Sequence, residues 1–261
     1  MLDSLKPISK EHSIARVTAT FILAQDILKL ENLIERLKIM PEFSRYQRKV
    51  IQKARKIKVN FDGTGEKNDV DSVVGFVFEE FDETGQIKNL IRVTNDIDQN
   101  RGLIIFETRK YERWDSFFFT MKNDIGAIFS TNRYYTKAIN LNYVDEFRWV
   151  SNDVIPVNEI FNIESELINK KFLNSENGSI LMLSQNKELN VEESTEISFN
   201  NRLKRIVINH QFGTEFKDIL SNEEVLYSEL LKDQFKIAHD ANKEMLSDLL
   251  TDTVSARIGI N

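Results

Sequence analysis

The chain contains no cysteine, and only nine glycines and three prolines occur among its 261 residues. The absence of cysteine excludes disulfides, thiolate zinc sites, iron–sulfur clusters and a cysteine nucleophile. The scarcity of glycine argues against nucleotide-binding loops, which use several glycines close together. One Gly-x-Gly occurs, in Asp62-Gly63-Thr64-Gly65, between an expected strand and a polar loop, and we interpret it as a turn.

Long apolar runs are also missing. Stretches such as Leu103 to Phe106 and Phe117 to Phe119 are far shorter than the ~20 residues of a membrane helix. The first residues, Met-Leu-Asp-Ser-Leu-Lys-Pro, lack the apolar core of a signal peptide. We therefore expect a cytoplasmic protein without a membrane partner.

The composition is that of a globular protein. Hydrophobic residues make up 41% and aromatic residues 10% of the chain, too much for a disordered polypeptide. Lysine and arginine total 35 and aspartate and glutamate 41, so the formal net charge is −6. An acidic protein of this kind binds nucleic acid only through a local basic patch.

Hydrophobic periodicity predicts an α+β fold: antiparallel sheet with helices packed on one face, closed by a long C-terminal helix. We expect one compact unit over 1–261, with a boundary near 152–158 between a strand-rich lobe (1–151) and a C-terminal lobe (152–261). Asp26 is the expected N-cap of the first helix, which ends before Pro41, and Asn177-Gly178 is an expected turn. Strands are expected over residues 14–23, 57–61, 73–81, 87–94, 103–108, 138–149, 180–183, 196–199 and 205–211. Helices are expected over residues 28–37, 43–54, 114–129, 160–172 and 231–249.

The most distinctive charged feature is a basic segment without an acidic residue. It consists of Arg45, Arg48, Lys49, Lys53, Arg55, Lys56 and Lys58. On a helix, the first four of these cations share one face, which could neutralise phosphates of an anionic partner. The competing interpretation is a solvated surface that faces acids such as Glu79 and Glu80.

An incomplete calcium-loop pattern follows. Asp96, Asp98 and Asn100 alternate, and Glu107 stands at the twelfth position. Arg101 occupies the position where such a loop needs glycine, and the flanking segments are expected strands. We interpret the segment as a hairpin connection, and the sequence predicts neither a metal nor a cofactor.

No catalytic residue is predicted. His12, His210 and His239 lack metal-pair spacing, and we interpret them as surface or capping residues. Adjacent carboxylates such as Glu79-Glu80 would point to opposite faces of a strand and make poor acid–base pairs. The aromatic run around Trp114 is interpreted as core, with a base-stacking platform as the alternative.

Two segments resemble a known family. Tyr111, Trp114 and Phe117 begin a helix that precedes the strand Ile139-Asn-Leu-Asn-Tyr-Val-Asp-Glu-Phe147. This order is similar to that of a sporadically distributed, functionally uncharacterised prokaryotic family of about this length. In that family the strand usually carries an arginine where Asn142 stands here. The resemblance implies no activity, but sporadic occurrence implies mobile genomic islands, where antiphage systems concentrate.

These observations favour a non-catalytic binding, sensor or accessory subunit of a prokaryotic system, with antiphage defence as the context that the resemblance implies and a protein as partner. The alternative is a nucleic-acid or phosphate-ligand binding protein that uses the basic segment. A carboxylate-dependent enzyme is a third class, because acids are abundant and sequence does not show which converge. The apolar stripe of the C-terminal helix could serve as core or as the interface of a homodimer.

Overall fold

We describe the fold from a computed structural model, which describes residues 2–9, 12–55, 71–96 and 98–260. The described residues form one ten-stranded antiparallel sheet with helices, so the α+β prediction is confirmed. The strands are β1 Leu5–Pro7, β2 Ile14–Leu23, β3 Arg48–Arg55, β4 Asp71–Phe81, β5 Ile87–Asp96, β6 Arg101–Thr108, β7 Tyr135–Trp149, β8 Asn177–Asn186, β9 Val191–Asn200 and β10 Arg205–Ser221. The helices are α1 Leu30–Ile39, α2 Trp114–Phe129, α3 Val157–Ile160, α4 Lys170–Leu173, α5 Asn222–Tyr227, α6 Leu230–Leu249 and α7 Asp252–Arg257, with 3-10 turns at η1 Leu2–Ser4 and η2 Pro41–Phe43.

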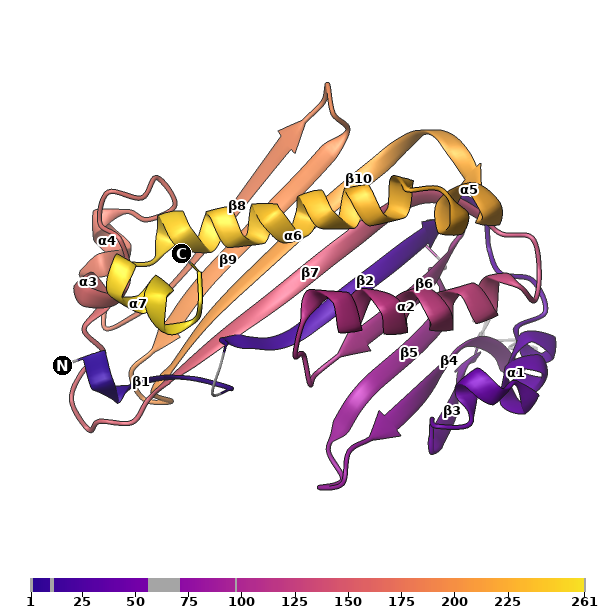
Figure 1. Cartoon of the computed structure of the whole chain (residues 1–261), viewed down its shortest axis with the longest axis horizontal. Coiled ribbons are helices and arrows are strands. Elements are labelled where there is room, and N and C mark those ends of the chain that lie inside the picture. The colour runs from indigo at the N-terminus through magenta and orange to yellow at the C-terminus, as the bar shows by residue number, and fades with distance from the viewer. Residues whose placement is uncertain (1, 10–11, 56–70, 97, 261) are drawn as a thin grey trace, which may run out of the picture.

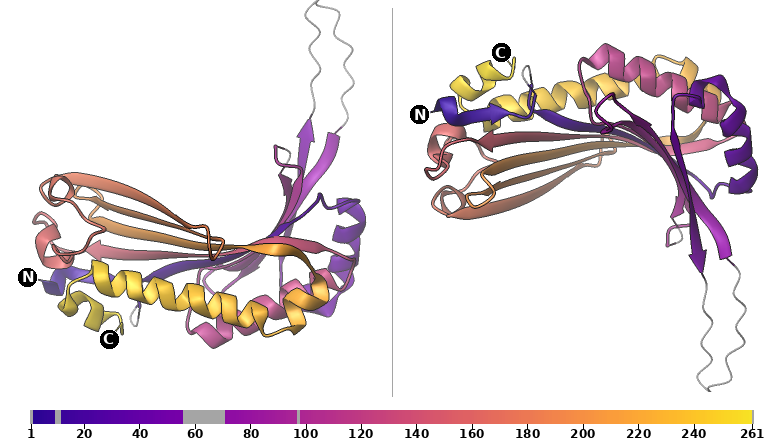
Figure 2. Two further views of the ribbon diagram at one scale, coloured as in Figure 1. Left: turned by 90° about the horizontal axis from the view of Figure 1, so that it is seen from above. Right: turned by 90° about the horizontal axis from the view of Figure 1, so that it is seen from below.

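The strand order is β3-β4-β5-β6-β2-β7-β10-β9-β8, with β1 added beside β7. Helices α2 and α6 lie across one face of this sheet, and no helix of the described residues covers the opposite face (Figures 1 and 2). We call these the helix face and the open face. The long strands β2 and β7 pair at the centre, so the start of β2 and the middle of β7 lie beneath the two long helices.

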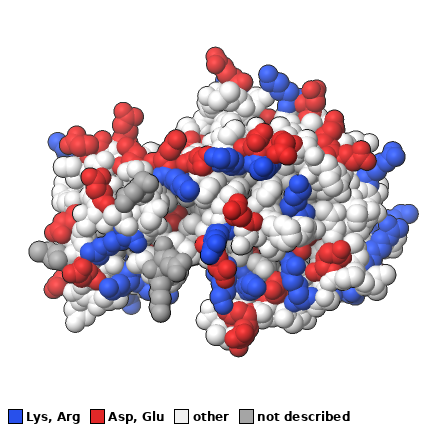
Figure 3. Space-filling model, viewed as in Figure 1, with Lys and Arg blue, Asp and Glu red and all other residues white. Residues whose placement is uncertain are grey.

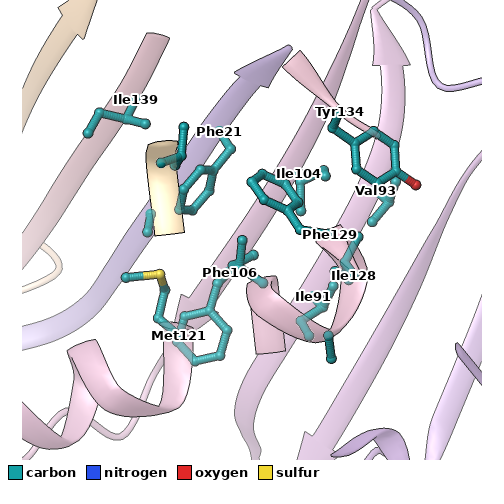
Figure 4. Close-up of a cluster of buried hydrophobic side chains, with 14 of the residues drawn as sticks. Phe21, Ile91, Val93, Ile104, Phe106, Met121, Ile128, Phe129, Tyr134 and Ile139 are labelled. Atoms are coloured by element: carbon teal, nitrogen blue, oxygen red, sulfur yellow. The ribbon is translucent and has the colours of Figure 1, made fainter. Parts of the chain in front are cut away.

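The core follows from the alternation of apolar residues along the strands. In β7, Ile139, Leu141 and Tyr143 are buried on the helix face. They join a cluster that packs the sheet against α2, in which Phe106 and Met121 meet (Figure 4). A second cluster lies under the C-terminal half of α6. Residues from both sides of the predicted lobe boundary enter both clusters, and the division into lobes stays a prediction.

The apolar stripe of α6 is part of this core. Leu231, Phe235 and Ala238 belong to the first cluster, and Met245 and Leu249 belong to the second. Each of these side chains is buried within the single chain. The interpretation of the stripe as core is therefore confirmed.

The helix expected over 43–54 is wrong. The segment forms η2 and then β3, which pairs with β4. The spacing of the cations suggested a helix, but successive side chains of the segment also alternate between two faces, as in a strand. Ile51 pairs with Phe76 on the helix face, whereas Val50 pairs with Val77 on the open face. Strand pairing with β4 overrides the helical pattern of charge.

Three smaller predictions are also wrong. Residues 160–172 form no continuous helix, because the side chains of Asn162 and Ser165 accept backbone N–H groups two residues on and make turns. Residues Asn177–Gly178 begin β8, where a Cβ on Gly178 would lie 2.8 Å from the rings of Phe172 and Phe199. The N-cap of α1 is Lys29, not Asp26. The strand expected over 57–61 and the turn at 62–65 lie outside the described residues.

Candidate functional site

The first cation of the basic segment lies in a buried ion-pair cluster. The Nε atom of Arg45 donates to Glu80 at 3.0 Å, and its guanidinium also pairs with Asp124 of α2. The hydroxyl of Tyr46 donates to the same Asp124 oxygen at 2.5 Å, and Asn89 donates to Glu80 at 2.8 Å. Arg45 therefore compensates two carboxylates that the fold buries.

The other cations of the segment do not form one face. Arg48 points to the open face and pairs with Glu79, whereas Lys49 lies on the helix face with its ammonium 5.2 Å from the ring centre of Phe78. Lys53 is exposed. The backbone of Arg55 belongs to β3, but its side chain, Lys56 and Lys58 lie outside the described residues.

A separate cluster of polar groups converges where sequence reasoning placed none. A pocket of about 290 Å³ lies between the residues that precede α2, the start of β2, the middle of β7, α6 and the C-terminal residues. We call it the Asp145 pocket. The face of the molecule that carries α2 and α6 has both signs of charge interspersed (Figure 3). The polar lining consists of His12, Ser13, Glu112, Asp145, His239, Asn242 and Lys243.

Asp145 is the most unusual of these residues. It stands at a position of β7 that faces the helix side, and it is 0% exposed. Its Oδ1 atom accepts a hydrogen bond from Ser13 at 2.5 Å, whereas Oδ2 is buried and has no partner among the described residues. Burial raises the pKa of Asp145 to about 6, although the Ser13 hydroxyl and His210 both act to lower it. At pH 7 the carboxylate is therefore mainly charged, and no described lysine or arginine pairs with it.

His12 adds a second buried acceptor to the pocket. Its Nε2 atom lies 2.8 Å from the backbone carbonyl oxygen of Tyr111. A carbonyl oxygen only accepts, so Nε2 carries the hydrogen and Nδ1 is left with a lone pair in the neutral ring. That Nδ1 atom is buried and has no hydrogen-bond partner among the described residues. Two unpartnered acceptors in one pocket require hydrogen-bond donors.

His239 and Trp114 form an aromatic wall. Their rings stack with centroids 4.6 Å apart and planes 10° from parallel. Burial, followed by the charge of Lys243, lowers the pKa of His239 to about 4, so the ring is neutral at pH 7. Burial keeps the pKa of Tyr143 well above its usual value, so its hydroxyl retains its proton, and the hydroxyl oxygen forms a hydrogen bond of 2.8 Å with Nδ1 of His239.

Polar groups continue from the pocket beneath α6. Asn242 is 2% exposed, and its Oδ1 atom lies 3.1 Å from Nδ1 of His210. The Nε2 atom of His210 donates to Glu193 at 2.8 Å, which lowers the pKa of that carboxyl group. His210 is 1% exposed and His239 8% exposed, so the interpretation of both as surface residues is wrong.

The structure also shows where the remaining candidates from the sequence lie in the fold. Asp96 pairs with Arg101 across the β5–β6 turn, and the interpretation of this segment as a hairpin connection is confirmed. The part of the chain that the structure describes holds no group of three or more metal-ligating side chains. In the aromatic run Phe117 is buried, while Phe119 is 68% exposed. Within the described ranges, no helix has both the length and the apolar character of a membrane span.

Sequence reasoning missed Asp145 and Asp124, although a signal for each exists. Asp145 occupies the same inward-facing parity of its strand as Tyr143 and Phe147. Asp124 lies on the stripe of α2 that includes Met121 and Ile128. An acidic residue at a position where the hydrophobic pattern predicts an apolar core residue indicates a buried polar site.

Comparisons with protein-family models and with curated proteins found no match to this chain. The resemblance to an uncharacterised prokaryotic family therefore stays a prediction.

Proposed function

We propose that the protein is a non-catalytic binding or sensor protein whose Asp145 pocket takes a small ligand with a protonated amine or amidine group. The observation that carries this proposal is the charged, fully buried Asp145, whose Oδ2 atom has no partner among the described residues and whose side chain lines a pocket. A buried carboxylate without a counter-ion is costly to the fold. A cationic donor removes that cost when it binds.

The charge and shape of the pocket support the same ligand class. Its lining holds two carboxylates, Asp145 and Glu112, and one ammonium, Lys243, while His239 is neutral. The complement to such a lining is a cation. An amidinium group offers several N–H donors in one plane, suited to Asp145 Oδ2 and to the imidazole acceptor of His12. The volume of about 290 Å³ lies at the lower end of the range for small-molecule sites.

The polar contacts support binding more than catalysis. The hydroxyl of Ser13 donates to Asp145, and no histidine of the described chain contacts that hydroxyl. A serine nucleophile needs a general base, for which imidazole is the usual group. His239, whose ring is neutral at pH 7, is held through Nδ1 by a hydrogen bond with the Tyr143 hydroxyl.

Calorimetric titration with matched small molecules tests the proposal. Benzamidinium carries the expected cation, and benzamide is its neutral counterpart of nearly the same shape. We expect benzamidinium to bind the wild-type protein more tightly than benzamide does. Asp145→Asn should weaken benzamidinium binding about 10- to 100-fold, the effect of a charged hydrogen bond.

The control is Asp218→Asn, because Asp218 is an exposed residue of β10 that does not line the pocket. It should leave the affinity unchanged. Equal binding of benzamide and benzamidinium, or equal affinity in the wild type and Asp145→Asn, would contradict the proposal.

The broader expectations stay predictions. A role in antiphage defence rests on the resemblance, and a protein partner is not identified by any contact described above. For the nucleic-acid alternative, Arg45 and Arg48 are held in ion pairs with acidic side chains. Those pairs reduce the positive charge that the segment can offer to phosphates.

A further inference from the structure

The two outermost strands of the sheet, β3 and β8, each have one edge that pairs with no other described strand. They lie at opposite ends of the strand order and of the molecule (Figure 2). Within the described residues, the backbone groups on their outer edges have no hydrogen-bond partner. An exposed strand edge of eight or ten residues is a template on which another strand can pair.

The β3 edge is positively charged. Lys49 and Lys53 extend from the helix face of the strand, and neither side chain forms an ion pair with a described residue. On the open face, Val50 is 41% exposed. The edge thus presents two ammonium groups on one face and an aliphatic side chain on the other.

The β8 strand is uncharged, but acidic side chains lie beside it. On the helix face it borders a groove of about 790 Å³ between β8, β9, α6 and the residues that precede α4. The described residues that line the groove include no lysine or arginine, and its carboxylates come from Glu164, Glu166, Glu193, Glu244 and Asp248. On the open face, Leu181 is 62% and Leu183 75% exposed.

We propose that the protein associates head to tail with itself, the β3 edge of one copy pairing with the β8 edge of the next. Every neighbouring pair along the strand order is antiparallel, so β3 and β8, which are first and ninth, have the same sense within the sheet, although the twist of the sheet turns one strand against the other (Figure 2). When two copies join with their helix faces on the same side, β3 and β8 pair in parallel.

That arrangement matches both faces of the two strands. Lys49 and Lys53 approach the acidic groove on the helix face, and Val50 approaches Leu181 and Leu183 on the open face. Lysine at a sheet edge discourages pairing with a second basic strand. Beside the acidic groove the same lysines become favourable, so charge selects β8 over another β3 as the partner.

Because the two edges differ, the contact is heterologous, and a bound pair still has one free β3 edge on one copy and one free β8 edge on the other. The association is therefore open-ended or closes into a ring. A symmetric dimer would instead use the same edge twice, which would bring like charges together.

Two edge variants test the proposal by sedimentation velocity. Lys49→Glu/Lys53→Glu reverses the β3 edge, and Leu181→Asp/Leu183→Asp adds charge to the β8 edge. We expect the average mass of the wild type to rise with protein concentration beyond that of a dimer, and the association to weaken with salt. Each variant alone should remain monomeric, because one of the two edges is blocked.

The decisive sample is an equimolar mixture of the two variants. One supplies an intact β8 edge and the other an intact β3 edge, so the mixture should form a one-to-one dimer that grows no further. The control Lys6→Glu/Lys217→Glu changes the net charge equally at exposed sites away from both edges and should associate as the wild type does. A wild type that is monomeric at all concentrations, a symmetric dimer, or a mixture that stays monomeric would overturn the proposal.

Discussion

Two buried aspartates of this protein differ in whether the chain supplies a counter-ion for the carboxylate. Asp124 in α2 and Asp145 in β7 are both 0% exposed, and burial raises the pKa of each to about 6. Asp124 accepts from Arg45 and Tyr46 through Oδ2, while its Oδ1 atom has no partner among the residues that the structure describes. Asp145 accepts only from the Ser13 hydroxyl and lines a pocket.

The difference lies in the counter-ion. A guanidinium from the same chain compensates Asp124, so its charge belongs to the fold. No described lysine or arginine does this for Asp145. A buried charge that the chain leaves uncompensated is a candidate for compensation by a ligand.

The largest expected effect comes from removing the counter-ion of Asp124. Arg45→Ala leaves Asp124 with no cation among the described residues, and Lys88, 3.5 Å away, is then the one described cation that pairs with Glu80. Breaking a fully buried pair costs about 3–5 kcal/mol, and we expect about 2–4 kcal/mol because the Arg45 side chain is 36% exposed. Urea denaturation at pH 7 measures the loss.

The matched control for that experiment is Arg92→Ala. Arg92 is exposed on β5 and has no ion pair with a described residue, so its removal should change the free energy of unfolding by less than about 0.5 kcal/mol. If the two variants lose similar stability, the ion-pair cluster is not structural.

Asp145→Asn should change the free energy of unfolding in the opposite direction, towards greater stability. The native pKa of about 6 lies above the unfolded value of about 3.9, so the native state binds more protons between these values and wild-type stability falls as pH rises through them. Asparagine does not titrate, and we expect the variant to be about 1–2 kcal/mol more stable than the wild type at pH 7.

That gain should shrink as the pH falls from 6 to 4, because Asp145 of the native wild type becomes protonated in this range and its buried charge is lost, while the unfolded chain takes up its proton only at about pH 3.9. Urea midpoints measured from pH 4 to pH 8 give the profile. A constant difference between the two proteins across this range would show that Asp145 is not the titrating group.

The smallest effect is expected on the salt dependence of DNA binding when charges of the basic segment are reversed. The variant Arg48→Glu/Lys49→Glu/Lys53→Glu reverses three of its charges. In the wild type, Arg48 lies on the opposite face of β3 from the two lysines, so one DNA backbone can contact at most two of the three residues. The slope of log affinity against log salt should therefore fall by no more than about 1.8. A decrease of about 2.7 or more would favour the nucleic-acid alternative.

The sequence predicted the fold where one periodicity dominates. The stripe of α6 and the alternation of β7 involve many apolar residues in a single pattern, and both elements form as expected. In β3 two patterns compete, because its cations have helical spacing while Val50 and Ile51 are β-branched. The pairing with β4 decides the outcome, and pairing is not visible in a local window.

The candidate site was less predictable because its residues are distant in sequence. Ser13 lies 132 positions from Asp145, and His239 lies 96 positions from Tyr143. Spacing rules find sites within one helix or loop, and they carry no information on contacts between β2, β7 and α6. The sequence signal for Asp145 is its position in β7, where the alternation predicts an inward-facing side chain.

The most direct test of the account is an NMR titration of the Asp145 carboxyl carbon. The account predicts a midpoint of about 6 in the free protein, because burial disfavours the charged form. It further predicts that benzamidinium moves the midpoint down, because a bound cation stabilises the carboxylate. A midpoint near the unperturbed value of about 3.9, unchanged by benzamidinium, would contradict it.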